Sequence, residues 1–214
     1  MLNYLLSLLP SMFEGLTLTL KVFTLTMMLS LPMGIFVALG RLSKIKVISR
    51  CVKIYIWIMR GTPLILQLVF IFFGLPLVGI TFDRFQAALI AFTLNYAAYF
   101  GEIFRAGIQS IELGQYEAAK VLGFGPIKAF TRIVLPQVLK RVLPPVSNEV
   151  ITLIKDTSLV YVVGLGELLR SGKIASNRDA SLVPLIVVAF FYLMLTAILT
   201  KALKLCEDKY SYYH

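Results

Sequence analysis

The chain has 214 residues, of which 58% are hydrophobic and only 15% are charged, a composition that excludes an ordinary water-soluble domain. Soluble domains carry about a quarter charged residues, whereas apolar runs of about 20 residues are typical of helices that cross a bilayer. The net charge of +10 does not indicate a nucleic-acid partner, because Lys and Arg concentrate in short segments between the apolar runs.

Uncharged apolar runs predict four membrane-spanning helices, at 22–40, 61–82, 85–101 and 180–200. A fifth is predicted at about 143–164, where Glu149, Lys155 and Asp156 interrupt the run. We therefore expect an all-α integral membrane protein with five transmembrane helices, forming a single domain over residues 1–214. Residues 2–13 form a short apolar lead, which we expect as a separate amphipathic helix at the outer interface.

The distribution of positive charge predicts the orientation of the chain. Most of the 21 Lys and Arg residues lie in 41–60, in 105–141 and in the tail after residue 200, and 41–60 contains no acid. Because positively charged segments stay in the cytoplasm, we expect the N-terminus outside and the C-terminus inside. Cys51 and Cys206 then both face the reducing cytoplasm, so no disulfide is expected.

A break is predicted in the second span, at Arg60-Gly61-Thr62-Pro63. Pro63 lacks a backbone donor and biases Thr62 away from the helical region. Backbone groups freed in a membrane must contact protein or water, and Gln67, one turn later, is a polar side chain within reach. The alternative is a simple helix start that Thr62 caps, with Pro63 in the first turn.

Polar side chains share one face of the third span. Asn95, Tyr99 and Glu102 follow the spacing i, i+4, i+7, and at ~1.5 Å per residue Asn95 lies near the middle of the bilayer. Such a stripe faces protein or a water-filled path. It indicates either a substrate pathway or hydrogen bonds between helices.

The fourth span carries Lys155-Asp156-Thr157-Ser158 about ten residues after its expected start near Val146. Charges at that depth are costly unless they are paired or hydrated, which makes them candidates for the substrate pathway. The hydroxyl side chains can also bond backbone carbonyls and loosen the helix, whose broken end would then bind a carboxylate or ammonium group. The alternative is a buried Lys–Asp pair that fixes helix packing. Residues 164–181 follow as an outer loop with a solvated surface of mixed charge.

Residues 114–136 interrupt the membrane pattern and predict two short helices exposed to the cytoplasm. The first covers 116–122 and ends with Gly123 as its C-cap glycine. The second begins at Gly125-Pro126, places Ile127, Phe130 and Val134 on one face, and ends at Pro136. A compact amphipathic pair of this kind is typical of a docking element.

This insert resembles the EAA loop of bacterial ABC-importer permeases. Every fixed position of that loop is filled, by Glu117, Ala118, Ala119, Gly123, Ile133, Leu135 and Pro136. Segments 60–68, 95–110 and 133–160 are similar to the polar amino-acid uptake subfamily, which includes histidine, arginine and glutamine permeases. One departure is Gly101, which precedes Glu102 where alanine is more usual.

The resemblance implies a type I ABC-importer permease fold in the bacterial cytoplasmic (inner) membrane. The coupling helices would lie within about 112–136, where Glu117, Ala118, Ala119, Gly123 and Pro136 contact a cytoplasmic dimer of ATP-binding subunits. It also implies a second permease copy, identical or similar, an extracytoplasmic amino-acid-binding protein, and surrounding lipid. ATP and Mg would bind the partner ATPase, with no cofactor or metal in this chain, and ATP binding would drive alternating access.

The sequence contains no G-x-x-x-x-G-K-[ST] phosphate loop, and its single histidine is His214, so we expect no enzyme activity in this chain. The predicted substrate-pathway residues are Gln67, Asn95, Tyr99, Glu102, Lys155, Asp156, Thr157 and Ser158. Two acids among them, Glu102 and Asp156, favour a cationic amino acid. The alternatives are an ATP-independent secondary transporter or channel, and a membrane scaffold without transport.

Overall fold

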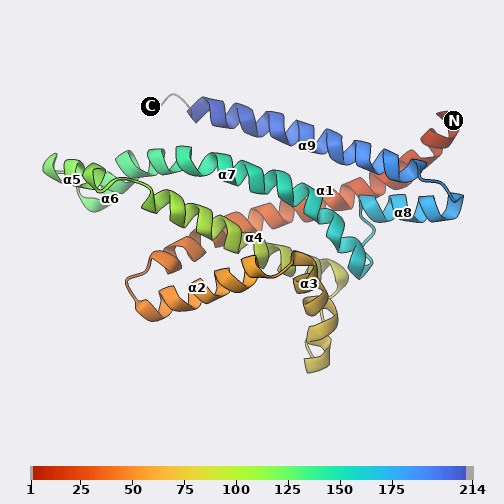
Figure 1. Ribbon diagram of the computed structural model, residues 1–214, viewed down its shortest axis with the longest axis horizontal. Coiled ribbons are helices and arrows are strands. Elements are labelled where there is room, and N and C mark those ends of the chain that lie inside the picture. The colour runs from red at the N-terminus through yellow and green to blue at the C-terminus, as the bar shows by residue number, and fades with distance from the viewer. Residues whose placement is uncertain (1, 211–214) are drawn as a thin grey trace.

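The computed structural model describes residues 2–210, so His214 lies outside the described residues. Every regular element within that range is a helix (Figure 1). The α-helices are α1 (Leu2–Leu42), α2 (Lys46–Gly61), α3 (Leu64–Val69), α4 (Arg84–Gln109), α5 (Leu113–Val121), α6 (Pro126–Ala129), α7 (Leu135–Asp156), α8 (Leu168–Asp179) and α9 (Val183–Tyr210). Shorter turns are the π-helices η1 (Phe70–Gly74) and η3 (Phe130–Val134) and the 3-10 helices η2 (Leu75–Val78) and η4 (Thr157–Val163).

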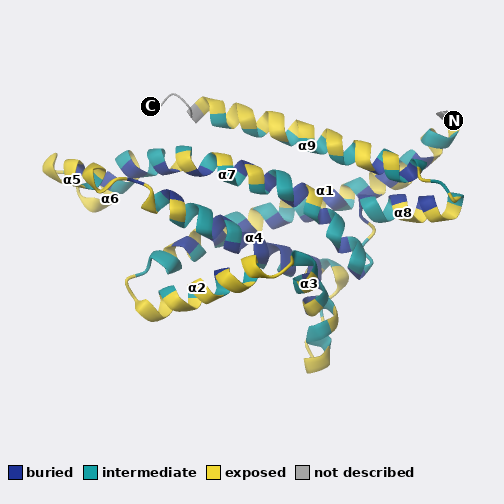
Figure 2. Ribbon diagram, in the orientation of Figure 1, coloured by how far each residue is buried: buried dark blue, intermediate teal, exposed yellow. Residues whose placement is uncertain are grey.

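The core lies between α1 and α4, which pack along each other. Phe92, Tyr96 and Phe100 of α4 are buried in the largest apolar cluster, and Figure 2 shows α4 largely buried while most of α9 is exposed. A Cβ atom on Gly101 would lie 2.7 Å from the Cβ of Val37. The glycine that departs from the more usual alanine therefore allows the two helix backbones to approach closely, as small residues do in membrane proteins.

Within the described residues, three single helices are long and apolar enough to cross a membrane, namely Asn3–Leu42, Arg84–Gln109 and Val183–Lys209. A fourth crossing is possible if α2 and the segment Leu64–Val78, which bend by 104° at their junction, count as one span. The expectation of a separate lead at 2–13 is wrong, because α1 runs unbroken from Leu2 to Leu42. Its apolar lead packs as part of that helix, with Leu8 and Met12 buried against α8 and α9.

The prolines around the fourth span do not end helices where the sequence suggested. Pro136 lies in the first turn of α7, where a missing N–H group costs nothing, so the expected helix end there is wrong. The expected start near Val146 is also wrong, because α7 continues through Pro144 and Pro145. The π-turn η3 precedes Pro136, with the Leu135 N–H donating to the Phe130 carbonyl, and this wider turn makes room for the proline ring.

Glu167 corrects the expectation that 164–181 is a solvated surface. This side chain is fully buried, and its carboxylate accepts hydrogen bonds of 2.7 Å from the N–H groups of Leu169 and Arg170. The Tyr192 hydroxyl of α9 also donates to it, at 3.1 Å. Burial raises the pKa of Glu167, and these hydrogen bonds oppose that rise. Glu167 therefore caps α8 and ties it to α9.

We predict that Glu167→Ala lowers the free energy of unfolding by about 1–3 kcal/mol, because the donors of α8 and Tyr192 lose a buried acceptor. In thermal unfolding of the detergent-solubilised chain, this corresponds to a fall in Tm of roughly 2–4 °C per kcal/mol. Glu167→Gln keeps an acceptor oxygen, so its Tm should lie between that of the unmodified chain and that of Glu167→Ala. Glu14→Ala removes an exposed acid from α1 and serves as the control; an equal loss in that variant would contradict the capping role.

Candidate functional site

The predicted break between α2 and α3 is confirmed. Thr62 (φ −120°, ψ 145°) and Pro63 (φ −61°, ψ 135°) are extended, and the chain bends there by 104°. The simple capped start does not apply, because no side chain caps α3 and the Thr62 hydroxyl donates to the Ile58 carbonyl at 2.8 Å. The break leaves carbonyl groups at the end of α2 without helical donors.

Gln67 and Asn95 satisfy those carbonyl groups. Both side-chain amides donate to the Met59 carbonyl at 2.9 Å, and the Asn95 amide also donates to the Gln67 side-chain oxygen at 3.1 Å. Asn95 is only 4% exposed. The structure thus brings these two predicted residues together in hydrogen bonds between helices, which stabilise the broken backbone.

A cavity of about 550 Å³ lies beside this break, between α2–α3, α4 and α7. Its lining residues are Arg60, Gly61, Thr62, Pro63, Leu64, Ile65, Asn95, Tyr96, Tyr99, Glu149, Thr152, Asp156 and Leu159. We call this the central cavity. The Arg60 guanidinium lies 5.1 Å from the Tyr99 ring centroid, and the Tyr96 hydroxyl donates to Asp156 Oδ2 at 2.8 Å. One guanidinium and two carboxyl groups therefore line the same space.

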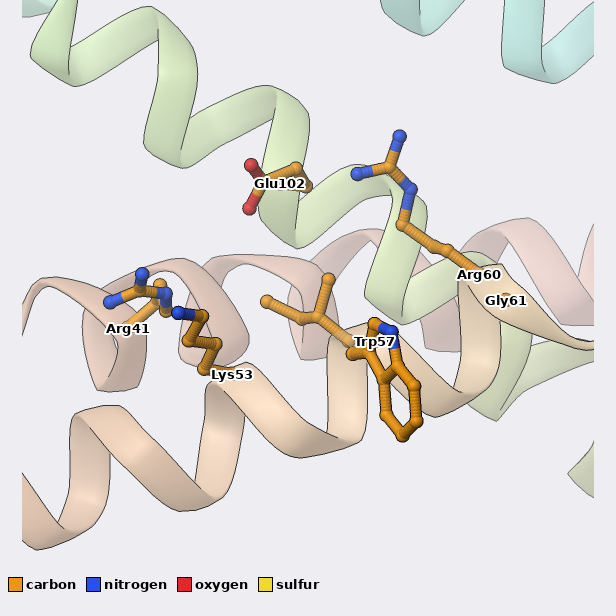
Figure 3. Close-up of a pocket in the computed structure, with 7 residues that line it drawn as sticks. Arg41, Lys53, Trp57, Arg60, Gly61 and Glu102 are labelled. Carbon is orange, nitrogen blue, oxygen red and sulfur yellow. The ribbon is translucent and has the colours of Figure 1, made fainter.

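Glu102 lies in a different cavity, of about 370 Å³, which we call the lower cavity. Arg105 binds its carboxylate through two nitrogens, with Nε–Oε2 at 2.8 Å and Nη2–Oε1 at 2.5 Å. Figure 3 shows Glu102 of α4 lining this cavity together with Arg41, Lys53 and Arg60. Glu102 and Asp156 are therefore not neighbours, and Arg60 is the charged residue that lines both cavities.

The two charged residues at the end of α7, Lys155 and Asp156, also line different cavities. Lys155 is exposed and lines a third cavity beside α9, with Ser158 and Tyr192. Among the described residues, Asp156 forms no ion pair with Lys155, so the alternative of a buried Lys–Asp pair does not apply. Thr157 is buried and its hydroxyl donates to the Ile154 carbonyl at 2.7 Å. The hydroxyl thus bonds a backbone carbonyl as expected, but the chain passes directly into the tighter 3-10 helix η4 at this residue, so the expected loosening into a broken helix end is wrong.

The loop that contains the EAA pattern forms the end of the molecule at the left of Figure 1. Gly123 has φ +77°, its N–H donates to the Lys120 carbonyl and the Phe124 N–H donates to the Ala119 carbonyl, both at 3.0 Å. These bonds form a Schellman motif, which confirms Gly123 as the C-cap glycine of α5.

Some motif residues of this loop lie on its surface, and others are buried inside it. Glu117 and Ala118 are exposed, whereas Ala119 is 1% exposed and packs inside. The expected apolar stripe of the second helix is divided as well, because Val134 is buried and Ile127 is 77% exposed. Large apolar side chains are also exposed in this loop, namely Leu113, Val121, Leu122 and Ile127.

Residues 30–212 match the family described as "Binding-protein-dependent transport system inner membrane component". The chain belongs to this family. The permease is 41% identical to the arginine transport system permease protein ArtQ of Bacillus subtilis (strain 168), over 94% of this chain and 92% of the relative. It is 34% identical to the putative glutamine transport system permease protein GlnP of Rickettsia conorii, over 98% of each chain.

Solved structures agree with this membership. A structure described as an amino acid ABC transporter with histidines matches the permease with a TM-score of 0.90 and 36% identity, over 97% of each chain. The inward-facing MetNI methionine ABC transporter matches with a TM-score of 0.71 at 21% identity and shows the shared fold alone. The all-α, type I ABC-importer permease fold and the resemblance to ABC-importer permeases are thus confirmed.

Family membership fixes the general role of the permease. It is the inner-membrane transport subunit of an ATP-driven importer, and ATP is hydrolysed on a separate subunit. This role replaces the alternatives of an ATP-independent transporter, a channel and a scaffold.

Of the residues that line the central cavity, only Asn95, Tyr99 and Asp156 were predicted for the substrate pathway, and the polar residues Arg60, Tyr96, Glu149 and Thr152 are among those that were not. Arg60 was assigned only to the charge distribution and to the segment of the predicted break, and Glu149 was assigned only as an interruption of a span. A usable signal was present, because residues 149, 152 and 156 follow i, i+3, i+7 and therefore share a helix face. That face points into the central cavity.

Proposed function

We propose that the permease moves a cationic amino acid through the central cavity. The observation that carries this proposal is the charge of the lining, where the Arg60 guanidinium accompanies two carboxyl groups, those of Glu149 and Asp156. An amino acid with a basic side chain carries the complementary set of one carboxylate and two cationic groups. The cavity volume of about 550 Å³ also falls in the range typical of small-molecule sites.

Each charged group has a distinct proposed role. Arg60 binds the α-carboxylate, because a guanidinium fork matches carboxylate geometry. Asp156, whose orientation the Tyr96 hydroxyl fixes, binds one ammonium group, and Glu149 binds the side-chain cation. The relatives named for arginine and glutamine, and the structure described with histidines, support a polar substrate.

The acidic pair behind this substrate class differs from the one that the sequence suggested. Glu102 is occupied by Arg105, so the cationic preference rests on Glu149 and Asp156. Gln67 and Asn95 support the broken backbone, with Asn95 also lining the cavity. Lys155 and Ser158 face α9 and are proposed to support the helices around the pathway without contact with the substrate, as Thr157 does at the helix end.

We propose that the permease crosses the membrane five times, with its N-terminus outside and its C-terminus inside. The bent pair α2 and Leu64–Val78 and the helix α7 with η4 complete the five crossings beside α1, α4 and α9. The basic residues of 41–60 and of the coupling loop support this orientation.

The partners follow from the surfaces that the chain leaves open. A cytoplasmic dimer of ATP-binding subunits, which hold ATP and Mg, docks on the loop 112–136 through Glu117 and Ala118. Ala119, Gly123 and Pro136 hold that loop in shape. A second permease copy covers the apolar arm Leu64–Val78, where Phe70 and Leu77 are 63% and 87% exposed. An extracytoplasmic binding protein delivers the substrate near α8.

The decisive experiment reconstitutes the permease with its ATPase and binding protein and measures ATPase stimulation by a panel of amino acids. Arginine, lysine or histidine should stimulate most strongly, glutamine less, and aspartate not at all. Stimulation by none of the cationic amino acids would overturn the substrate class. Uptake that proceeds without ATP would overturn the coupling and favour a secondary transporter.

A further inference from the structure

The corner where α1 ends and α2 begins gathers cations that form no ion pair with any acid in the described part of the chain. A cavity of about 320 Å³ is lined there by Arg41, Ser43, Lys46, Ser49, Arg50 and Lys53, with no acid among them. We call this the corner site. It shares Arg41 and Lys53 with the lower cavity, where the acid Glu102 is already bound by Arg105.

The corner site is a built pocket rather than a free loop. Arg41 Nη1 donates to the Ser49 hydroxyl at 2.9 Å, and that hydroxyl donates to the Arg41 carbonyl at 2.9 Å, which ties the end of α1 to α2. Four like charges around one small cavity repel each other unless an anion neutralises them. The first turn of α2 also has no side-chain cap, so its N–H groups are available to the same anion.

Apolar side chains continue from the corner site along α2. Ile54, Trp57 and Ile58 are 50%, 74% and 44% exposed, and Figure 3 shows Trp57 on the same helix as Lys53. A small soluble anion would leave these side chains in contact with water. A helix with a basic face and exposed Trp and Ile instead suits the boundary between headgroups and acyl chains.

We propose that the corner site binds the phosphate headgroup of an anionic phospholipid, whose acyl chains cover Ile54, Trp57 and Ile58. The position of the corner favours lipid over a protein partner. Figure 1 shows α5 and α6 extending further along the long axis than the α1–α2 corner at the same end of the molecule. A subunit that docks on the coupling loop therefore meets that loop first, and the corner is set back toward the membrane.

Trp57 allows a direct test, because it is the single tryptophan of the chain. The full-length permease is reconstituted in unbrominated phosphatidylcholine bilayers. One series contains increasing fractions of phosphatidylglycerol with brominated acyl chains, and the other contains the same fractions of phosphatidylcholine with brominated acyl chains. Bromine quenches tryptophan fluorescence on contact. We expect brominated phosphatidylglycerol to associate about fivefold more strongly at Trp57, the effect of roughly one basic contact, and this preference to weaken at high salt.

In the variant Lys46→Gln/Arg50→Gln/Lys53→Gln, the ratio of phosphatidylglycerol association to phosphatidylcholine association at Trp57 should fall to nearly one. The matched control is Lys201→Gln/Lys204→Gln/Lys209→Gln, which removes the same charge from α9 and should retain the preference. The single variant Arg50→Gln, at an exposed position of α2, should lower the preference partly, and it keeps the test valid if the triple variant does not fold.

Several results would overturn the proposal. Equal quenching by the two lipids would show that no selective site exists, and equal loss in the control would assign the preference to diffuse surface charge. Quenching by neither lipid would mean that protein covers this face. Loss of the cognate ATPase during purification of the triple variant, without any lipid preference in the unmodified chain, would assign the corner to that subunit.

Discussion

Uptake by the Glu117→Lys permease is expected to fall more than a hundredfold, with loss of substrate-stimulated ATPase activity. Glu117 is exposed on α5, in a loop that also exposes large apolar side chains, while Ala119 and the Schellman motif at Gly123 hold the helix from inside. The substitution therefore changes the docking surface and not the fold. Reversal of a charge at a protein interface costs several kcal/mol, and each 1.4 kcal/mol is a factor of ten.

The measurement is uptake and ATPase activity in proteoliposomes that contain the whole complex. Glu112→Lys is the matched control, because Glu112 is an exposed acid just before α5 and outside the motif. It should keep most of the activity. Full coupling in Glu117→Lys, or equal loss in the control, would show that Glu117 has no special role in contact with the ATPase.

The Asp156→Asn permease should bind a cationic amino acid roughly 30- to 100-fold more weakly, because removal of one partner from a buried charge pair costs at least about 2 kcal/mol. The asparagine oxygen still accepts the Tyr96 hydrogen bond that orients Asp156, so the cavity should keep its shape. The dissociation constant is measured by calorimetry on the purified complex without its binding protein, since that protein would otherwise dominate the apparent affinity.

Lys155→Gln supplies the control for this prediction. The two residues are adjacent in sequence, yet Asp156 lines the central cavity and Lys155 lines the cavity beside α9. The control should bind arginine with nearly unchanged affinity. Equal weakening in both variants would point to a disturbed helix end, and no weakening in Asp156→Asn would move the substrate site elsewhere.

Local chemistry explains which features were predictable from the sequence. The break at Thr62-Pro63 and the C-cap at Gly123 follow from backbone conformations that neighbouring residues impose, and both are present. The identity of the coupling loop followed from spacing along the chain. These features need no knowledge of which helices are neighbours.

Features that depend on packing between distant segments were not predictable in this way. Glu102 shares a helix face with Asn95, yet the packing of α1 and α2 places it beside Arg41 and Lys53 in the lower cavity and outside the central cavity. Glu167 lies in a segment of mixed charge, and its burial involves packing against α9, whose Tyr192 donates a hydrogen bond to its carboxylate. Pro144 and Pro145 are tolerated inside α7, which packs against α4 and α9, and no local rule anticipates this.

The contact between Gly101 and Val37 has an evolutionary consequence. The space that a methyl group on residue 101 would fill already holds the valine side chain, and extra volume in a packed interface is costly. The two positions, 64 residues apart in the sequence, are therefore expected to covary among relatives. A relative with alanine at the position of Gly101 should carry a smaller residue at the position of Val37, so that the pair changes together while the separation of the two helices is inherited.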